Sequence, residues 1–220
     1  MKITFISLFP EYYESFKNHS IIKNALNKEL VEIEQVNPRD FTEDGKVDDY
    51  IYGGGSGMLL MIEPIVKAIK SIKTDDSYVA LVGPRGNALD QQKVRSMTTI
   101  KHLILICGHY EGIDSRIKNY IDEEISIGDY IITGGETASM IIADSIIRLL
   151  PGVIKEESHQ DESFENDGLL EHDQFTKPLS YDGHNVPEVL TSGNHEDIKK
   201  WRKQSSIDRT IEIKINKKGN

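Results

Sequence analysis

The sequence predicts an α/β fold with a mainly parallel sheet and helices on both faces of that sheet. Short apolar runs rich in β-branched residues, typical of buried strands, recur along the chain, and segments with helical spacing separate them. Three of these runs end in loops rich in glycine or proline. Because such sheets bind ligands at the carboxyl ends of their strands, these loops are the first candidates for a site.

The first third of the chain predicts two strands and two helices around one long loop. Residues 3–8 form the first apolar run, and residues 11–30 place apolar side chains at helical spacing. Apolar and acidic residues alternate over 31–36, as in a half-exposed strand. Clusters of Pro, Asp and Gly predict a loop over 37–58, and apolar residues three and four apart predict a helix over 62–72.

The middle of the chain alternates in the same way. Apolar runs predict buried strands over 78–82 and 102–107, which end at Gly83 and Gly108. Residues 89–97 predict a helix, and 114–120 predict one or two helical turns. Strand signals over 124–132 are interrupted by Gly128 and Asp129. A strongly amphipathic helix is expected over 138–150, where Pro151 and Gly152 end it.

The composition changes after Pro151. Residues 155–173 are polar, acidic and poor in periodicity, which favours a linker or a mobile loop. Residues 196–206 predict a small helix rich in lysine and arginine. We therefore expect an α/β domain over 1–154, a linker or active-site loop over 155–173 and a small helical domain over 174–220.

Composition excludes several classes of protein. The 220 residues are 38% apolar and 28% charged, enough for a packed core and against wholesale disorder. A single cysteine excludes an internal disulfide and a Cys-rich zinc site. No apolar run approaches the roughly 18–20 residues of a membrane span, and the first apolar run is interrupted too early for a signal peptide. A soluble, cytoplasmic protein is expected, and its net charge of −10 argues at first against a nucleic-acid partner.

The segment from Tyr52 to Met58 contains four glycines in five positions. Such a loop brings backbone N–H groups close to a ligand, or adopts positive φ angles in a tight structural turn. It lacks the Lys-Ser/Thr ending of a phosphate-binding P-loop, so both interpretations stay open.

Two further loops follow apolar runs. In the segment 108–114, Glu111 is placed to hold a ligand hydroxyl or amine; the alternative is a glycine-capped turn whose glutamate faces water. The segment 127–136 is apolar yet broken by three glycines, and its backbone must find hydrogen-bond partners, which an adenine ring supplies. The alternative there is a β-bulge before a helix, with Glu136 at the positive end of the helix dipole.

Charged residues outside these loops have simple interpretations. Arg148, in the last predicted turn of its helix, is a cation that complements the helix dipole. Asp161 and Glu162 lie in the polar loop beside His159, where acidic side chains are usually solvated. No serine or cysteine occurs in a nucleophile-elbow context, and Cys107, inside an apolar run, is interpreted as a small core residue.

Several motifs together match one family over nearly the whole chain. They include Ser7-Leu8-Phe9-Pro10-Glu11, Tyr52-Gly53-Gly54-Gly55, Gly108-His109-Tyr110-Glu111-Gly112, Ser126-Ile127-Gly128-Asp129-Tyr130, Gly134-Gly135-Glu136, Arg148-Leu149-Leu150-Pro151-Gly152-Val153 and Ser192-Gly193-Asn194-His195. In order and spacing, the sequence resembles the bacterial tRNA (guanine-N(1)-)-methyltransferases of the trefoil-knotted SPOUT superfamily.

The resemblance implies a deep C-terminal trefoil knot that binds S-adenosyl-L-methionine, a homodimer whose active sites form between two chains, and a helical domain that grips tRNA. It also links activity to Mg²⁺, without implying metal ligands. The implied donor-binding residues are Leu81, Gly83, Pro84, Gly86, Gly108, Tyr110, Glu111, Gly112, Ile127, Gly128, Asp129, Tyr130, Ile131, Ile132, Gly134 and Gly135. The implied substrate-binding residues are Tyr52, Gly53, Gly54, Gly55, Ser192, Asn194, His195, Trp201 and Arg202.

The implied reaction is methylation of N(1) of the guanosine immediately 3′ of the anticodon. The resemblance gives the catalytic roles to an arginine, matched by Arg148, and to an aspartate just before Ser-Phe. Glu162 occupies that second position with Asp161 before it, so both carboxylates are candidate bases. Gly83 also replaces a usual serine, and the C-terminal region ends earlier than is usual. A non-catalytic relative that binds S-adenosylmethionine or RNA, and a knotted methyltransferase that acts on another RNA, are the alternatives.

Charge distribution removes the objection to a nucleic-acid partner. From Asp197 onward the chain has eight lysines and arginines against three acidic residues. An acidic body with a basic end fits a protein that contacts tRNA locally.

Overall fold

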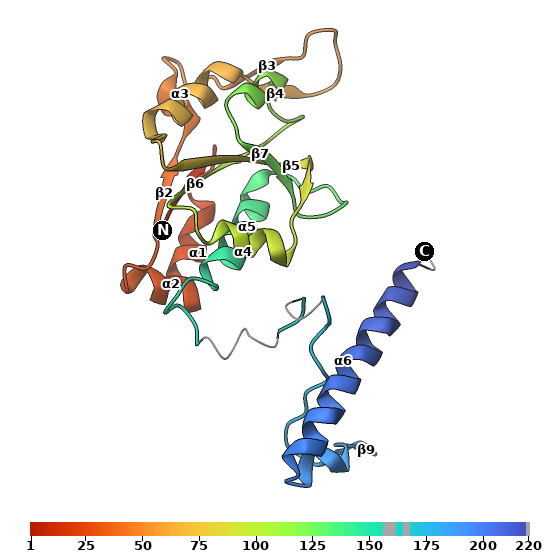
Figure 1. Cartoon of the computed structure of the whole chain (residues 1–220). Coiled ribbons are helices and arrows are strands. Elements are labelled where there is room, and N and C mark those ends of the chain that lie inside the picture. Colours follow the sequence, from red (N-terminus) through yellow and green to blue (C-terminus); the bar gives the residue numbers. More distant parts are fainter. Residues whose placement is uncertain (156–161, 165–167, 219–220) are drawn as a thin grey trace. The chain divides into compact units, whose positions relative to one another are not determined.

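The computed structural model describes residues 1–155, 162–164 and 168–218, and the chain divides into two compact units, Met1–Ile154 and Lys155–Asn220. The first unit contains a five-stranded sheet in the order β2-β1-β6-β5-β7, and every neighbouring pair is parallel (Figure 1). Its strands are β1 (Lys2–Ile6), β2 (Glu32–Val36), β5 (Ser77–Ala88), β6 (His102–Cys107) and β7 (Glu123–Ser126). The predicted α/β class with a parallel sheet is confirmed.

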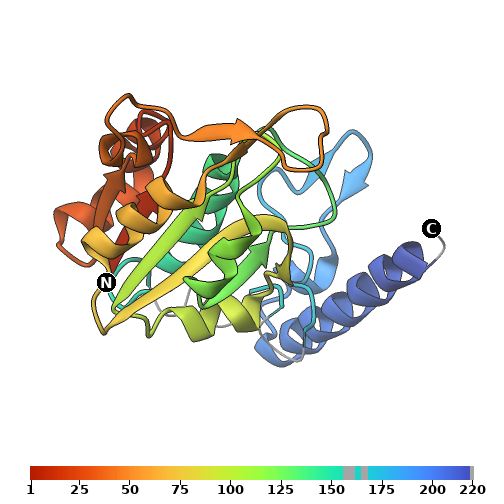
Figure 2. The ribbon, with the colours of Figure 1, turned by 90° about the horizontal axis from the view of Figure 1, so that it is seen from above.

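Alternate residues of the central strands pack on opposite faces of the sheet, as the two-residue period of a strand requires. On one face, Phe5 and Leu105 pack in a buried cluster with Ile142 of α5 (Gly135–Ile147). On the other face, Ile6 and Ile106 pack with residues of α3 (Ile62–Ile72). Helices therefore cover both faces of the sheet, and Figure 2 shows the strands from a second direction.

The predicted helix over 11–30 is wrong in one respect, because it is two helices, α1 (Tyr12–Asn18) and α2 (Ser20–Asn27). His19 between them is extended, and Ser20 has a φ of 51°. The side chains of Asn18 and His19 contact the carbonyl oxygens of Glu14 and Ser15, at 2.8 Å each. Such local side-chain bonds compete with the helical backbone pattern and end α1.

The predicted loop over 37–58 contains structure that the sequence pattern did not reveal. A 3₁₀ turn, η1 (Pro38–Phe41), is followed by an antiparallel hairpin of β3 (Asp48–Tyr50) and β4 (Met58–Leu60). Each of these strands has only three residues, too few for a visible alternation of apolar and polar side chains. The glycine-rich segment is the connection of this hairpin.

The strand expected over 78–82, ending at Gly83, is longer in the structure, because β5 continues to Ala88. Ile125 of β7 pairs both with Val82 and with Asn87, and the register shifts between these two residues. The residues from Gly83 to Gly86 therefore bulge out between two stretches that pair with β7. The remaining elements of this unit are α4 (Gln91–Met97), η2 (Ser115–Asn119) and α5, which begins three residues before the predicted start and ends just before Arg148.

The second unit is built around α6 (His195–Lys218), which continues well beyond the predicted 196–206. It also holds the short strands β8 (Ser180–Tyr181) and β9 (His184–Asn185) and the turn η4 (Glu188–Thr191). The backbone N–H of Leu170 donates to Thr210 Oγ1 on α6 at 2.9 Å, and that of Asp173 donates to Ser205 Oγ at 3.1 Å. These bonds hold residues 170–173 against α6. Across the described residues, no helix has the length and apolar character needed to cross a membrane.

Candidate functional site

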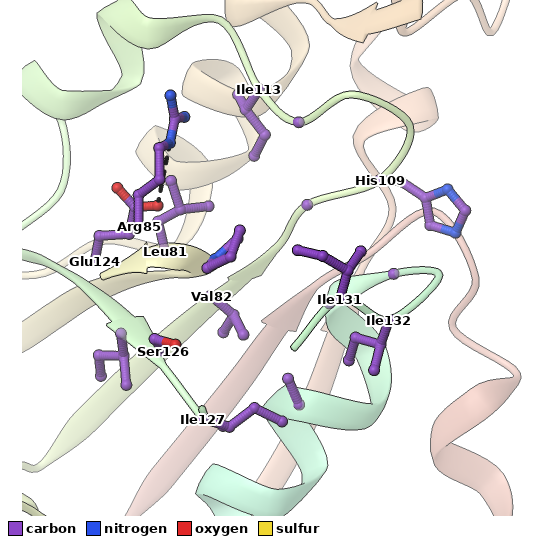
Figure 3. Close-up of a pocket in the computed structure, with 18 of the residues that line it drawn as sticks. Leu81, Val82, Arg85, His109, Ile113, Glu124, Ser126, Ile127, Ile131 and Ile132 are labelled. Carbon is purple, nitrogen blue, oxygen red and sulfur yellow. Dashed lines mark ion pairs between the residues drawn. The ribbon is translucent and has the colours of Figure 1, made fainter. Parts of the chain in front are cut away.

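A pocket of about 280 Å³ opens at the bulge of β5 and at the carboxyl ends of β6 and β7 (Figure 3). Its wall comes from the β5 bulge and from the loops that follow β6 and β7, so residues from distant parts of the chain meet there. The lining residues lie in the segments 81–85, 108–113, 124–128 and 130–135, with Ala138 of α5. This is the edge of a parallel sheet where ligands bind.

Much of the wall is apolar. Val82, Ile127, Ile131 and Ile132 contribute apolar side chains to the lining, and Figure 3 labels all four. Ile131 is 82% exposed, so its apolar side chain is accessible to a bound ligand. An apolar wall of this kind suits a flat ring, and the adjacent loop backbone supplies polar groups.

The segment after β7 has a non-repeating backbone held by short-range bonds. Ser126 Oγ donates to the carbonyl oxygen of Gly128 and accepts from its N–H, both at 3.2 Å. The φ of Gly128 is +146°, and the N–H of Tyr130 donates to the same carbonyl at 3.0 Å. This part of the pocket therefore has a defined turn as its base.

Glu136 does not line the pocket. It lies in the first turn of α5, is 2% exposed, and its Oε1 accepts a hydrogen bond from Ser7 Oγ at 2.8 Å. A carboxylate near a helix N-terminus is favoured by the helix dipole, so Glu136 joins α5 to the end of β1. The geometry therefore supports the interpretation in which Glu136 lies at the positive end of the α5 dipole.

Two carboxylates line the pocket, and only one of them, Glu111, was singled out from the sequence. The other is Glu124, whose side chain is 13% exposed and whose Oε1 lies 3.9 Å from Nε of the more exposed Arg85. Figure 3 marks this ion pair. A weakly solvated carboxylate with one distant cation favours a ligand that carries positive charge. No sequence signal points to Glu124, because its neighbours in the pocket come from other strands.

His109 is a second pocket residue that sequence reasoning left without a role. Its ring packs between Phe9 and Tyr110, with centroid distances of 5.0 and 5.2 Å. Its Nδ1 is buried and has no hydrogen-bond partner within the described part of the chain. Its place in the loop that follows β6 was the available signal.

Two glycines permit close crossings of the backbone. A Cβ at Gly135 would lie 2.8 Å from Cys107 Cα and from the nitrogen of Gly108, and the N–H of Gly135 donates to the Gly108 carbonyl at 2.8 Å. A Cβ at Gly86 would lie 2.4 Å from the backbone of Glu124. Real Cβ contacts are longer, so any side chain at either position requires the backbone to move.

Most of the residues that the resemblance assigns to the methyl donor line this single pocket. Gly86 and Asp129 are the two exceptions. Gly86 instead lies where its backbone passes close to that of Glu124. The others are Leu81, Gly83, Pro84, Gly108, Tyr110, Glu111, Gly112, Ile127, Gly128, Tyr130, Ile131, Ile132, Gly134 and Gly135.

The implied substrate-binding residues occur at two places outside the pocket. Tyr52, Gly53, Gly54 and Gly55 lie in the β3–β4 connection, where Tyr52 is fully exposed and the three glycines have positive φ. The rest surround the start of α6 in the second unit. There Ser192 Oγ accepts from the N–H of Asn194 (3.1 Å), and Asn194 Oδ1 accepts from the N–H of Glu196 (3.2 Å). His195 begins α6, Trp201 packs against the rings of His172 and Phe175, and Arg202 is exposed.

The implied catalytic residues belong to different units. Arg148 is half-buried directly after α5, and its N–H donates to the Asp144 carbonyl at 3.1 Å. Glu162 lies in the second unit, and Asp161 lies outside the described residues. Their meeting with Arg148 stays a prediction.

Cys107 is confirmed as a core residue. Its Sγ lies 3.1 Å from the hydroxyl oxygen of Tyr13, and burial raises the pKa of its thiol to about 12. A thiol in that state is a poor nucleophile. In the part of the chain that the structure describes, no three His, Cys, Asp or Glu side chains form a group able to hold a metal ion.

Comparison with known proteins gives a consistent result. A family model described as tRNA (guanine-1)-methyltransferase TrmD matches residues 1–217. Proteins named tRNA (guanine-N(1)-)-methyltransferase resemble the chain throughout. The one from Malacoplasma penetrans is 54% identical over 99% of this chain and 96% of its own length. Those from Mycoplasma mycoides and Clostridium botulinum are 53% and 50% identical, over 96% and 97% of this chain and 89% and 90% of their own lengths. The chain therefore belongs to the tRNA (guanine-1)-methyltransferase family.

Proposed function

We propose that this protein transfers a methyl group from S-adenosyl-L-methionine to N(1) of the guanosine immediately 3′ of a tRNA anticodon. The observation that carries the proposal is the pocket at the β5 bulge and the ends of β6 and β7, lined by the segments that match the family's donor-binding motifs. Family membership supplies the reaction type, and the relatives' names supply the base and its position N(1).

The chemical character of the pocket fits this donor. The apolar wall that includes Ile131 and Ile132 suits the adenine ring, and the carboxylates of Glu111 and Glu124 complement the donor's ammonium and sulfonium charges. The cavity of about 280 Å³ is near the lower end of the range for small-molecule sites. When bound, the donor supplies an electrophilic methyl group.

The chain's own residues provide proton transfer and charge stabilisation. N(1) of guanine carries a proton and becomes nucleophilic when a carboxylate removes it. The negative charge that then builds on O(6) is stabilised by the guanidinium of Arg148. The bond between N(1) and the methyl carbon forms as the carbon–sulfur bond breaks, and the donor leaves as the neutral thioether. Holding the two reacting atoms close supplies much of the acceleration.

The base is assigned to the pair Asp161 and Glu162. Glu162 stands where the family has its aspartate, and its side chain is one methylene longer. Separate Asp161→Ala and Glu162→Ala variants identify the base by which of them loses turnover. Full activity in both would remove the carboxylate base from the mechanism.

The proposal includes the family's trefoil knot and its SPOUT fold. Two observations support it. Ile125 pairs with β5 on both sides of the bulge from Gly83 to Gly86, and the start of α5 crosses the end of β6 at Gly135. Both are tight passages of one chain segment past another.

A homodimer with active sites between chains is also part of the proposal. Ile141 on α5 is 45% exposed and Tyr12 on α1 is 48% exposed, although both helices pack into the core through their other residues. A second copy of the chain covers such residues. Mixing Arg148→Ala protein with a variant that lacks the base tests the arrangement. If each site takes one residue from each chain, random mixing restores about a quarter of the activity, whereas sites within one chain stay dead.

The helical second unit is proposed to hold the tRNA. Lys199, Arg202 and Lys203 are exposed on α6, where they are available to phosphates. Binding through such contacts weakens steeply as the salt concentration rises. Because the substrate is tRNA, the proposed location is the cytoplasm.

The function is tested by mass spectrometry of tRNA incubated with the protein and the methyl donor, with and without Mg²⁺. Methylguanosine next to the anticodon is expected, and Arg148→Ala should abolish it while donor binding stays nearly intact. Donor binding without transfer to any tRNA would instead support a non-catalytic relative, which the Glu162 substitution favours. Methylation elsewhere would indicate another RNA substrate.

A further inference from the structure

The β3–β4 hairpin is attached to the pocket loop by backbone hydrogen bonds. The N–H of Glu111 donates to the Met58 carbonyl, the N–H of Leu60 donates to the Gly112 carbonyl, and the N–H of Asp114 donates to the Leu60 carbonyl, all at 3.0 Å. Leu60 and Ile113 also form a parallel bridge. The hairpin and the loop after β6 therefore hold each other in one register.

This register places Glu111 directly over Gly57. A Cβ at Gly57 would lie 2.7 Å from both Cγ and Oε1 of Glu111 and 3.1 Å from its Cδ. The Glu111 side chain thus occupies the space that a side chain at residue 57 would need. Because Cγ is blocked as well as the carboxylate, the whole Glu111 side chain would have to change its rotamer.

The other glycines of the loop have no such neighbour. Gly53 and Gly54 have φ angles of +88° and +82°, with nothing within 4 Å of an added Cβ, and Gly55 would meet only Ile51 Cδ1 at 3.9 Å. A tight turn explains these three glycines. It leaves the close contact at Gly57 unexplained.

We propose that Gly57 is a positioning residue for the donor site, because its missing side chain seats the Glu111 carboxylate at the pocket wall. Glu111 lines the pocket and is suited to an amine or hydroxyl group of a bound ligand. The identity of that ligand as S-adenosyl-L-methionine rests on the proposed function. The glycine-rich hairpin then acts on the methyl donor through this one residue, in addition to any contact it makes with RNA.

The test compares Gly57→Ala with Gly45→Ala by calorimetric titration of the full chain with S-adenosyl-L-methionine. Gly57 has a φ of +87°, and Gly45 has a φ of +75° with nothing within 4 Å of an added Cβ. Both variants therefore carry the strain of a left-handed alanine. Only Gly57→Ala displaces Glu111. We expect Gly57→Ala to weaken donor binding about tenfold and Gly45→Ala to change it less than about twofold.

The same pair is then measured in a Glu111→Ala background. With the Glu111 side chain gone, Gly57→Ala should weaken donor binding no more than Gly45→Ala does. If Gly57→Ala alone does not fold, adding Glu111→Ala removes the obstacle and should restore folded protein, as followed by circular dichroism.

Three results would each overturn the proposal. The two alanine variants could lose donor affinity equally, or Gly57→Ala could weaken binding just as much when Glu111 is alanine. The third is that Gly57→Ala does not fold and the double variant does not fold either. These results can be distinguished from a failure of the proposed function. If the parent protein does not bind the donor, the proposed function fails. If it binds and Gly57→Ala behaves like Gly45→Ala, only the positioning role fails.

Discussion

Replacing Gly135 with alanine is expected to destabilise the first unit, because its Cβ would meet backbone atoms that cannot rotate away. Cys107 Cα and the nitrogen of Gly108 would both lie 2.8 Å from it. Overpacking of this kind costs about 1–3 kcal/mol. Separating the segments also weakens the 2.8 Å bond from Gly135 to Gly108, worth about 0.5–1.5 kcal/mol. Alanine recovers about 1 kcal/mol of helix propensity, which leaves a net loss of about 0.5–3.5 kcal/mol, centred on about 2 kcal/mol.

The matched control is Gly108→Ala on the other side of the crossing. An added Cβ there would meet only the Val82 carbonyl oxygen, at an ordinary 3.7 Å. Its effect on stability should stay within about 0.5 kcal/mol, although Gly108 lines the pocket and the methyl group should weaken donor binding.

Thermal unfolding followed by circular dichroism separates the two variants. For a chain of this size, about 2–4 °C is lost per kcal/mol, so Gly135→Ala should melt about 4–8 °C lower for a loss of about 2 kcal/mol. Gly108→Ala should melt within about 2 °C of the parent. If both variants melt together, or if Gly135→Ala melts with the parent, the close crossing does not constrain the fold.

Ser7→Ala removes the donor to the buried Glu136 carboxylate and should cost about 1–3 kcal/mol in urea unfolding; a loss below about 0.5 kcal/mol would contradict this. Burial holds the pKa of His102 below its usual value. As the pH falls, the imidazole is therefore protonated in the unfolded chain before it is protonated in the folded chain, and the free energy of unfolding should fall between about pH 7 and 6.5. His102→Gln should flatten that part of the stability curve, and an unchanged slope would exclude the assignment. Glu124→Gln should weaken calorimetric binding of S-adenosyl-L-methionine more than that of S-adenosylhomocysteine, which lacks the sulfonium charge; equal losses would count against charge recognition.

Periodicity predicted the elements whose apolar pattern is long and regular. The strand over 102–107 and the helix over 62–72 match β6 and α3 residue by residue. Periodicity did not predict the β3–β4 hairpin or the break between α1 and α2. Three-residue strands carry too little pattern, and the break depends on side-chain bonds to the backbone that compete with the helix.

For the pocket, sequence reasoning selected the loops that line it but not every lining residue. The motif around Glu111 was visible because it follows an apolar run directly. Glu124 and Arg85 were not selected, because they meet only when β7 lies beside β5.

The sequence by itself determined the family, the α/β class and the loops at the strand ends, because these depend on local pattern and on the order of motifs. Only the tertiary structure decided what each glycine is for. Gly135 and Gly86 let one backbone pass another, and Gly57 leaves room for the Glu111 side chain. The physical reason is that these contacts join residues far apart in the chain, and local spacing does not record which atoms folding brings within 3 Å of each other.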